Sequence, residues 1–394
     1  MKIKNFKVIA AALSLSMILA ACGADNNTAN EETKNETAVE ETENQEQASE
    51  AEEASEAETT ETAEEASEET TEESTDEPMA DTVKVTMVTD FGGVNDKSFN
   101  QSAYEGLVKA DEEGVAEYDY IESHKEDDYL PNLESALDSE SDIILTVGYA
   151  LFPATDEAAE ENPEQNYVII DNQNENGREN LLGVTFADHQ NSFLVGYIAG
   201  MTSETNKVGF VGGKESVIID RFEYGYRAGV EQAAKDKGED IEVLVQYANS
   251  YSDQAAGKNI ANRMYQEGAD VVFHAAGGVG VGVIEAAKEN DKWVIGVDRD
   301  QTDEAPDNIL VSTIKGVGDA VRQVIDDYGN FEGGDVQFTI ADGEAVTIAY
   351  PTTNELVSQE TKDKVEEIRQ KLIDGELEAP ENKEQAIEQG WIVE

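Results

Sequence analysis

Along most of the chain, segments with the apolar pattern of a strand alternate with segments that have the apolar spacing of a helix. Short apolar runs bounded by turn residues, such as residues 85–88, are typical of parallel strands covered on both faces. Segments with the helical spacing of apolar residues lie between such runs, for example residues 190–202 and 359–372. This alternation predicts an α/β fold with parallel sheets.

The predicted strands form two similar series. The first is residues 82–88, 118–123, 142–146, 167–171 and 182–186, and the second is residues 208–211, 241–247, 270–274, 293–298 and 309–314. Matching segments such as Asp142-Ile143-Ile144-Leu145 and Asp270-Val271-Val272-Phe273 set an offset of about 125 residues. Two further short strands are expected within residues 337–350. The duplication predicts two doubly wound lobes that face each other across a cleft.

The chain has to pass between the two lobes, and three crossings would form the hinge on which the cleft closes. We expect lobe 1 to comprise residues 81–186 and 315–340. Lobe 2 is then expected to comprise residues 187–314 and 341–394.

The loop after the first strand has the layout of a ligand-binding loop. Gly92-Gly93 permits a sharp turn, and Asn95, Asp96 and Ser98 offer capping groups for the helix that follows. Ligands of open α/β sheets bind outside the carboxyl ends of the strands, where this loop is expected. An ordinary strand-to-helix connection is the alternative, because glycine, asparagine and aspartate are common in loops.

An aromatic pair links this loop to the second series. Phe99 and Phe222 occupy equivalent positions, each at the start of a helix with a glycine seven residues later. From opposite lobes they could stack on the two faces of a flat ligand, which suits a nucleobase. The alternative is that both are core phenylalanines.

The first residues of the chain resemble a bacterial lipoprotein signal. Three lysines precede an apolar run over residues 8–19, which is too short to span a bilayer, and Leu19-Ala20-Ala21-Cys22 resembles the lipoprotein box. We expect a signal peptide over residues 1–21 and acylation of Cys22; an ordinary cleaved signal is the alternative. Residues 22–80 are expected to form a disordered acidic tether, because residues 24–80 hold 22 acids against Lys34 alone.

Composition excludes several function classes. A net charge of −60, from 87 acidic against 27 basic residues, argues against nucleic-acid binding, because phosphate contacts need clustered Lys and Arg. One cysteine excludes a disulfide framework, and three histidines leave little material for metal catalysis. The catalytic motifs of serine hydrolases, zinc proteases and P-loop enzymes are missing from the sequence. We therefore expect no enzyme activity, no cofactor and no metal.

The stretch Val88-Thr89-Asp90-Phe91-Gly92-Gly93-Val94-Asn95-Asp96-Lys97-Ser98-Phe99-Asn100-Gln101 resembles the signature opening of the basic membrane protein family, the nucleoside-binding lipoproteins of the purine nucleoside receptor A type. The segments 222–230, 274–278, 296–298 and 312–315 also resemble motifs of that family. The resemblance covers residues 82 to about 380. It implies a type I periplasmic-binding-protein fold and a substrate-binding lipoprotein that delivers nucleosides to an ABC permease.

The resemblance also implies roles for individual residues. Phe99 and Phe222 would stack on the base, and Asn100 would hydrogen-bond its edge. Asp90 and Asp298 would accept hydrogen bonds from the ribose hydroxyls, since carboxylates accept strongly from such groups. The ligand-binding residues expected in all are Asp90, Asn95, Asp96, Phe99, Asn100, Tyr149, Phe222, Gly277, Asp298 and Lys315. Gly277 would allow close backbone approach and Lys315 would reach the sugar side, while Asp96 has the alternative of bracing its loop or capping its helix.

One departure from the family concerns the third strand. An acidic side chain that can read the purine edge follows there in the family, but here Gly148-Tyr149 is followed by Ala150-Leu151-Phe152-Pro153, and Asp156 comes later. This puts the purine preference in doubt. Tyr149 and Asp171 are expected at strand ends that face the cleft. His274 is expected to be a strand-end residue, with a ligand contact as the alternative.

These observations predict a monomeric lipid-anchored binding protein on the outer face of the cytoplasmic membrane, of a Gram-positive type of cell. Its expected ligand is a nucleoside, with a purine preferred, and its expected partner is an ABC permease. A sugar or signalling-molecule binder of the same fold is the alternative, because aromatic stacking also suits sugar rings. A nucleoside-hydrolysing enzyme is a weaker alternative.

Overall fold

The computed structural model describes residues 82–393. The signal peptide, Cys22 and the acidic tether therefore lie outside the described residues. Within residues 82–393, no helix has both the length and the apolar character needed to cross a membrane.

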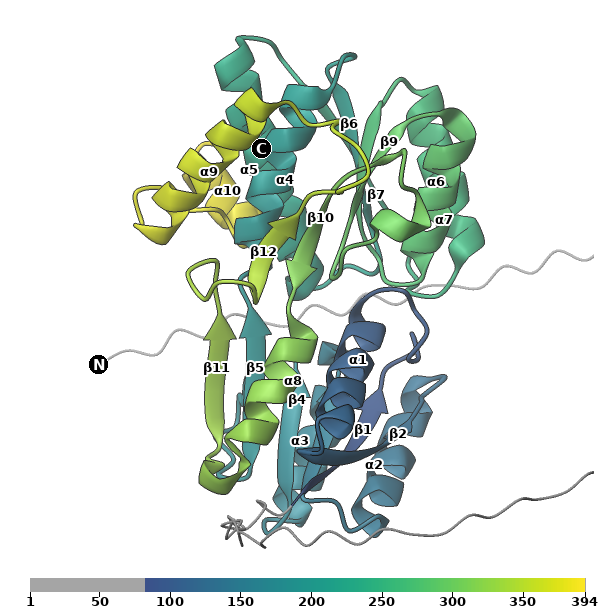
Figure 1. Cartoon of the computed structure of the whole chain (residues 1–394), viewed down its shortest axis with the longest axis vertical. Coiled ribbons are helices and arrows are strands. Elements are labelled where there is room, and N and C mark those ends of the chain that lie inside the picture. The colour runs from purple at the N-terminus through teal and green to yellow at the C-terminus, as the bar shows by residue number, and fades with distance from the viewer. Residues whose placement is uncertain (1–81, 394) are drawn as a thin grey trace, which may run out of the picture. The chain divides into compact units, whose positions relative to one another are not determined.

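Lobe 1 is built on a six-stranded parallel sheet in the order β11-β5-β4-β3-β1-β2 (Figure 1). Its strands are β1 (Val83–Thr89), β2 (Ala116–Ile121), β3 (Ile143–Val147), β4 (Asn166–Ile170), β5 (Leu181–Phe186) and β11 (Gly334–Phe338). Its helices are α1 (Phe99–Glu112), α2 (Tyr129–Asp138), α3 (Phe152–Glu161) and α8 (Val317–Asp326). The central strands β3 and β4 are almost wholly buried, as continuous apolar runs in a covered parallel sheet require.

Lobe 2 repeats this order of strands. Its sheet runs β12-β10-β9-β8-β6-β7, and all pairs are parallel except that of β12 with β10. The strands are β6 (Lys207–Gly212), β7 (Glu242–Tyr247), β8 (Val271–Ala275), β9 (Trp293–Gly296), β10 (Ile309–Lys315) and β12 (Val346–Ala349). The helices are α4 (Asp188–Thr202), α5 (Val217–Lys237), α6 (Gln254–Gln266), α7 (Val279–Asn290), α9 (Gln359–Ile373) and α10 (Lys383–Glu388). The predicted duplication of two doubly wound lobes is confirmed.

The chain passes between the two sheets three times. It leaves lobe 1 after β5 at Ala187, returns after β10 at Gly316, and leaves again between β11 and β12. The two short strands expected within residues 337–350 thus belong to different sheets, and the first begins earlier, at Gly334. In each lobe the strand order reverses direction between the first and third strands. This switch point is where doubly wound sheets bind ligands.

The glycines that follow the two aligned phenylalanines allow close helix packing. A Cβ atom on Gly106 would lie 2.6 Å from the Cα atom of Gly318, so α1 and α8 approach closely there. A Cβ atom on Gly229 would lie 2.0 Å from the carbonyl oxygen of Phe193, where α5 crosses α4. Seven residues are about two helical turns, so each helix presents its phenylalanine and its glycine on a similar side. The repeated spacing therefore has a packing cause in addition to any role of the phenylalanines.

We expect Gly229→Ala to lower the free energy of unfolding by about 1–3 kcal/mol, because the added methyl group has to displace the backbone of α4. Gly329→Ala is the matched control, since no atom lies within 4 Å of the added carbon, and its effect should stay within about 0.5 kcal/mol. Urea unfolding measures both values. Equal midpoints for the two variants would show that the close approach of α4 and α5 is not a constraint.

Candidate functional site

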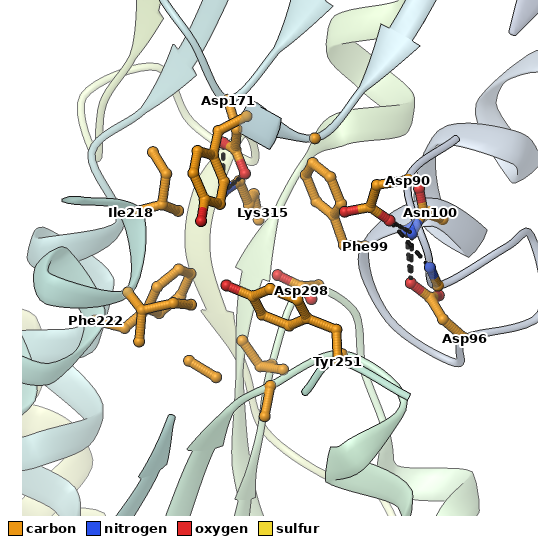
Figure 2. Close-up of a pocket in the computed structure, with 18 residues that line it drawn as sticks. Asp90, Asp96, Phe99, Asn100, Asp171, Ile218, Phe222, Tyr251, Asp298 and Lys315 are labelled. Carbon is orange, nitrogen blue, oxygen red and sulfur yellow. Dashed lines mark hydrogen bonds and ion pairs between the residues drawn. The ribbon is translucent and has the colours of Figure 1, made fainter. Parts of the chain in front are cut away.

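A pocket of about 590 Å³, including its open mouth, lies between the carboxyl ends of the two sheets (Figure 2). Its lining residues come from both lobes and are Asp90, Gly92, Asp96, Phe99, Asn100, Gly148, Tyr149, Asp171, Ile218, Ile219, Phe222, Tyr251, Ala275, Ala276, Gly277, Val297, Asp298 and Lys315. The pocket combines aromatic rings with several carboxylates and one ammonium group.

Asp96 caps the helix that carries Phe99. Its carboxylate accepts hydrogen bonds from the backbone N–H groups of Ser98, Asn100 and Gln101 at 2.8, 2.9 and 3.1 Å. A carboxylate at a helix N-terminus satisfies the free N–H groups of the first turn and interacts favourably with the helix dipole. Burial raises the pKa of Asp96, and these hydrogen bonds lower it in part. Of the two alternatives for this residue, the cap is the one that the hydrogen bonds support.

Asp90 and Asn100 form a pair on one side of the pocket (Figure 2). The Asn100 side-chain amide donates to Asp90 at 2.8 Å and to Asp96 at 3.1 Å. Because carboxylates only accept, this geometry fixes which way the amide points. Burial raises the pKa of Asp90 to about 6, against the lowering effect of the bonds from Asn100 and the Gly92 N–H. Asn100 therefore holds Asp90 in place, whichever ligand group the pair meets.

Phe99 and Phe222 both point into the pocket, Phe99 from α1 of lobe 1 and Phe222 from α5 of lobe 2 (Figure 2). The ammonium nitrogen of Lys315 lies 5.1 Å from the ring centre of Phe99 and 5.4 Å from that of Phe222. Phe222 is only 3% exposed and also packs against Phe273, with ring centres 6.4 Å apart. It is therefore a core residue of lobe 2 and a wall of the pocket at once.

Lys315 is a buried cation held by carboxylates from both lobes. Its Nζ atom is 2.8 Å from Asp171 Oδ2 and 3.0 Å from Asp188 Oδ2. Burial alone would lower the pKa of Lys315, but the charges of Asp171, Asp188 and Asp298 outweigh it and raise the pKa above its usual range. Lys315 stays charged, and ion pairs fix its position over the rings of Phe99 and Phe222.

Asp298 lies two residues after β9 and has a positive φ of 67°, a conformation that is uncommon for residues other than glycine. The hydroxyl of Ser98 in lobe 1 donates to its carboxylate. Burial raises the pKa of Asp298 to about 7, while Lys315 and the Ser98 bond lower it in part. The strained backbone and raised pKa are typical of a functional position.

Nine of the ten predicted ligand-binding residues line the pocket, and Asn95 does not. The side chain of Asn95 is exposed, because the loop turns its neighbours Val94 and Asp96 inward. Two further residues are placed clearly: Asp156 is ion-paired with Arg178 at 2.9 Å, and His274 is fully buried in lobe 2 without lining the pocket. Burial lowers the pKa of His274 to about 4.

Sequence reasoning missed Tyr251 and Asp188. Tyr251 lies in the loop after β7, and its carbonyl oxygen accepts a hydrogen bond from Val279 N at 3.3 Å. In the sequence, Tyr251 follows a predicted strand, which is the one signal that could have placed it at the cleft. Asp188 is the first residue of α4, directly after a crossing, and only the fold brings it to Lys315.

Among residues 82–393, no group of three or more His, Cys, Asp or Glu side chains is arranged to hold a metal ion. The carboxylates of the pocket are instead bound to Lys315, Ser98 and Asn100.

The chain is similar in sequence and structure to known proteins. The family described as "ABC transporter substrate-binding protein PnrA-like" matches residues 83–383. The CD4+ T-cell-stimulating antigen of Listeria monocytogenes is 42% identical over 320 residues, which cover 75% of this chain and 88% of the relative. The ABC transporter nucleoside-binding protein BmpA of Lactococcus lactis subsp. cremoris is 40% identical over 322 residues, 76% of this chain and 89% of the relative.

A solved structure extends the likeness to the fold. A solute-binding protein of an ABC transporter system from Aeropyrum pernix K1 superimposes with a TM-score of 0.73 at 26% sequence identity. The superposition covers 78% of this chain and 97% of that protein. The expected type I periplasmic-binding-protein fold is confirmed.

The raised carboxylate pKa values predict a pH dependence of stability. Folding raises the pKa of Asp90, Asp188 and Asp298 from about 3.8 to between about 6 and 7, mainly through burial. Between pH 4 and 7 the folded protein therefore holds protons that the unfolded chain has released, so this contribution to stability falls as pH rises. We expect the ligand-free protein to have a higher Tm at pH 5 than at pH 7.5.

Asp298→Asn is the control for this pH dependence, because the variant and the wild type differ in this one acid alone. When the pH is lowered from 7.5 to 5, the Tm of the variant should rise by less than that of the wild type, since one of the three titrating groups is removed. An equal gain in both proteins would mean that Asp298 ionises normally in the folded state.

Proposed function

Because the chain belongs to the PnrA-like family of ABC transporter substrate-binding proteins, we propose that it captures a nucleoside between its lobes and delivers it to an ABC permease. The observation that carries this proposal is the pairing of two aromatic rings with a carboxylate and a lysine in one interlobe pocket. In this proposal the protein is a monomer, lipid-anchored through Cys22, on the outer face of the cytoplasmic membrane.

The base would lie between Phe99 and Phe222. Each ring offers a flat apolar face, and the two rings enter the pocket from different lobes, so a planar base can contact both only when the cleft is closed. The preference of Phe222 for the core does not oppose this role, because its packing against Phe273 fixes the ring in place. A pre-positioned ring loses little freedom when the ligand binds.

The polar groups divide between the two ends of the ligand. Asp298 and Lys315 belong together, because Lys315 N donates to the Asp298 carbonyl at 2.9 Å and its charge acts on the Asp298 carboxylate. We assign this end to the ribose hydroxyls. Asp90 lies instead with Asn100, so we now assign Asp90 to the base edge rather than to the ribose. An acceptor at Asp90 would stand in for the acid that is missing after Tyr149.

The charge of the pocket favours a neutral ligand. Asp90, Asp96, Asp171 and Asp298 line it, and Lys315 is the cation among its lining residues. A ligand with several hydroxyl donors gains from these acceptors, whereas a phosphorylated nucleotide would be repelled by them. This supports a nucleoside over a nucleotide.

A sugar binder of the same fold is the second candidate, because the same rings and carboxylates suit a sugar. Calorimetric titration with adenosine, guanosine, inosine and uridine, beside free adenine, ribose and galactose, separates the two. We expect nucleosides to bind more tightly than either of their parts, with purine nucleosides ahead of uridine. Tight binding of a sugar with no response to nucleosides would contradict the proposal.

We expect Phe99→Ala and Phe222→Ala each to weaken nucleoside binding by about 5- to 150-fold, because stacking on one aromatic face contributes about 1–3 kcal/mol. Phe331→Ala is the control, since Phe331 lies in lobe 1 and does not line this pocket. The measurement is calorimetric Kd at a temperature where all variants are folded.

Phe222 also belongs to the core, so Phe222→Leu is added to keep an apolar side chain while removing the aromatic face. Loss of affinity in Phe222→Leu with a Tm close to that of the wild type identifies stacking as the cause. Unchanged affinity in both Phe99→Ala and Phe222→Leu would exclude the aromatic sandwich.

A further inference from the structure

The loop between β1 and α1 makes contacts across the cleft. At its start, the Nζ atom of Lys214 in lobe 2 lies 4.6 Å from the ring centre of Phe91. At its end, the carbonyl oxygen of Lys97 accepts a hydrogen bond of 2.9 Å from Nε2 of Gln301 in lobe 2. The loop that carries Asp90 and Asp96 is thus held from the opposite lobe at both ends.

Gln301 is 1% exposed, and its polar groups are bound in three directions. Its Oε1 atom accepts from Val297 N at 3.0 Å, and its backbone N–H donates to the Ser312 hydroxyl at 3.2 Å. Both of these bonds lie within lobe 2. Because Oε1 is committed to Val297, the amide can turn only its Nε2 donor toward Lys97.

The same side chain also supports Asp298. Val297 immediately precedes Asp298, whose φ of 67° is costly for a residue with a side chain. A strained backbone persists only where its surroundings hold it, and the bond from Val297 N to Gln301 is such a restraint. The side-chain amide of Gln301 therefore holds the turn that carries Asp298, and the same amide also contacts the opposite lobe.

We propose that Gln301 is a positioning residue that latches the closed cleft, so that ligand release requires the hydrogen bond from its side chain to Lys97 to break. The identity of the ligand as a nucleoside rests on the function proposed above; the latch itself rests on the contacts between the lobes. Opening the cleft separates Gln301 from Lys97 and Ser98 from Asp298 together, since both pairs join the same loop to the same strand end.

The test compares Gln301→Glu with the wild type. Glutamate keeps an acceptor for Val297 N, loses the donor to Lys97, and turns a carboxylate oxygen toward the Lys97 carbonyl. We expect the dissociation rate of adenosine, inosine or guanosine to rise about 3- to 10-fold, with the association rate changed less than about 2-fold. Surface plasmon resonance on the immobilised protein measures both rates.

Gln165→Glu is the matched control, because the side chain of Gln165 donates to the Ser141 carbonyl at 3.1 Å within lobe 1 and does not line the pocket. The dissociation rate of this variant should equal that of the wild type. Gln301→Met removes both the donor and the acceptor. A purely structural role predicts that Gln301→Met lowers Tm while the folded protein releases ligand at the wild-type rate, and that result would overturn the latch.

Small-angle X-ray scattering of the ligand-free proteins tests the latch without any ligand. We expect a larger radius of gyration for Gln301→Met and Gln301→Glu than for the wild type and for Gln165→Glu. If the wild type binds none of the nucleosides, the proposed function fails while the radius of gyration still decides on the latch. The latch would be overturned if the Gln301 variants matched the wild type in both radius of gyration and dissociation rate. If the wild type binds no nucleoside, equal radii alone would overturn the latch.

Discussion

The fold depends on one buried charge, the ammonium group of Lys315. It is 2% exposed, and its ion-pair partners come from the end of β4 and from the start of α4. The charge of Asp298, which follows β9, also acts on it. Lys315 itself is the last residue before the chain returns to lobe 1. Removing one partner of such a buried pair typically costs about 3–5 kcal/mol. The ion pairs therefore tie both lobes together at the hinge and fix the cation beside the ligand pocket.

This arrangement explains how a hinged protein keeps a defined site. Lys315, which would meet the sugar, is held at the hinge, where the lobes move least relative to each other. The side chains that would meet the base lie on the loop before α1, at the start of α1 and on α5, and they therefore come from different lobes. Closure would complete the pocket, because its two aromatic rings come from different lobes.

Much of the fold could be predicted from the sequence, because the alternation of apolar runs and helical spacing is strong and occurs twice. The duplication also placed Phe99 and Phe222 in equivalent positions, which the pocket brings together. Side chains whose role depends on tertiary geometry could not be predicted. Asp188 and Gln301 look like ordinary helix-start and loop residues, and the exposed side chain of Asn95 shows that a loop motif does not decide which of its members face inward.

The central claim is that the interlobe pocket holds a nucleoside with its base between aromatic rings of the two lobes. A crystal structure of residues 82–393 with a purine nucleoside bound tests this most directly. We expect the base between Phe99 and Phe222, the ribose hydroxyls on Asp298, and the Gln301 bond to Lys97 intact. A nucleoside bound outside this pocket, or with its ribose between the two rings, would contradict the claim.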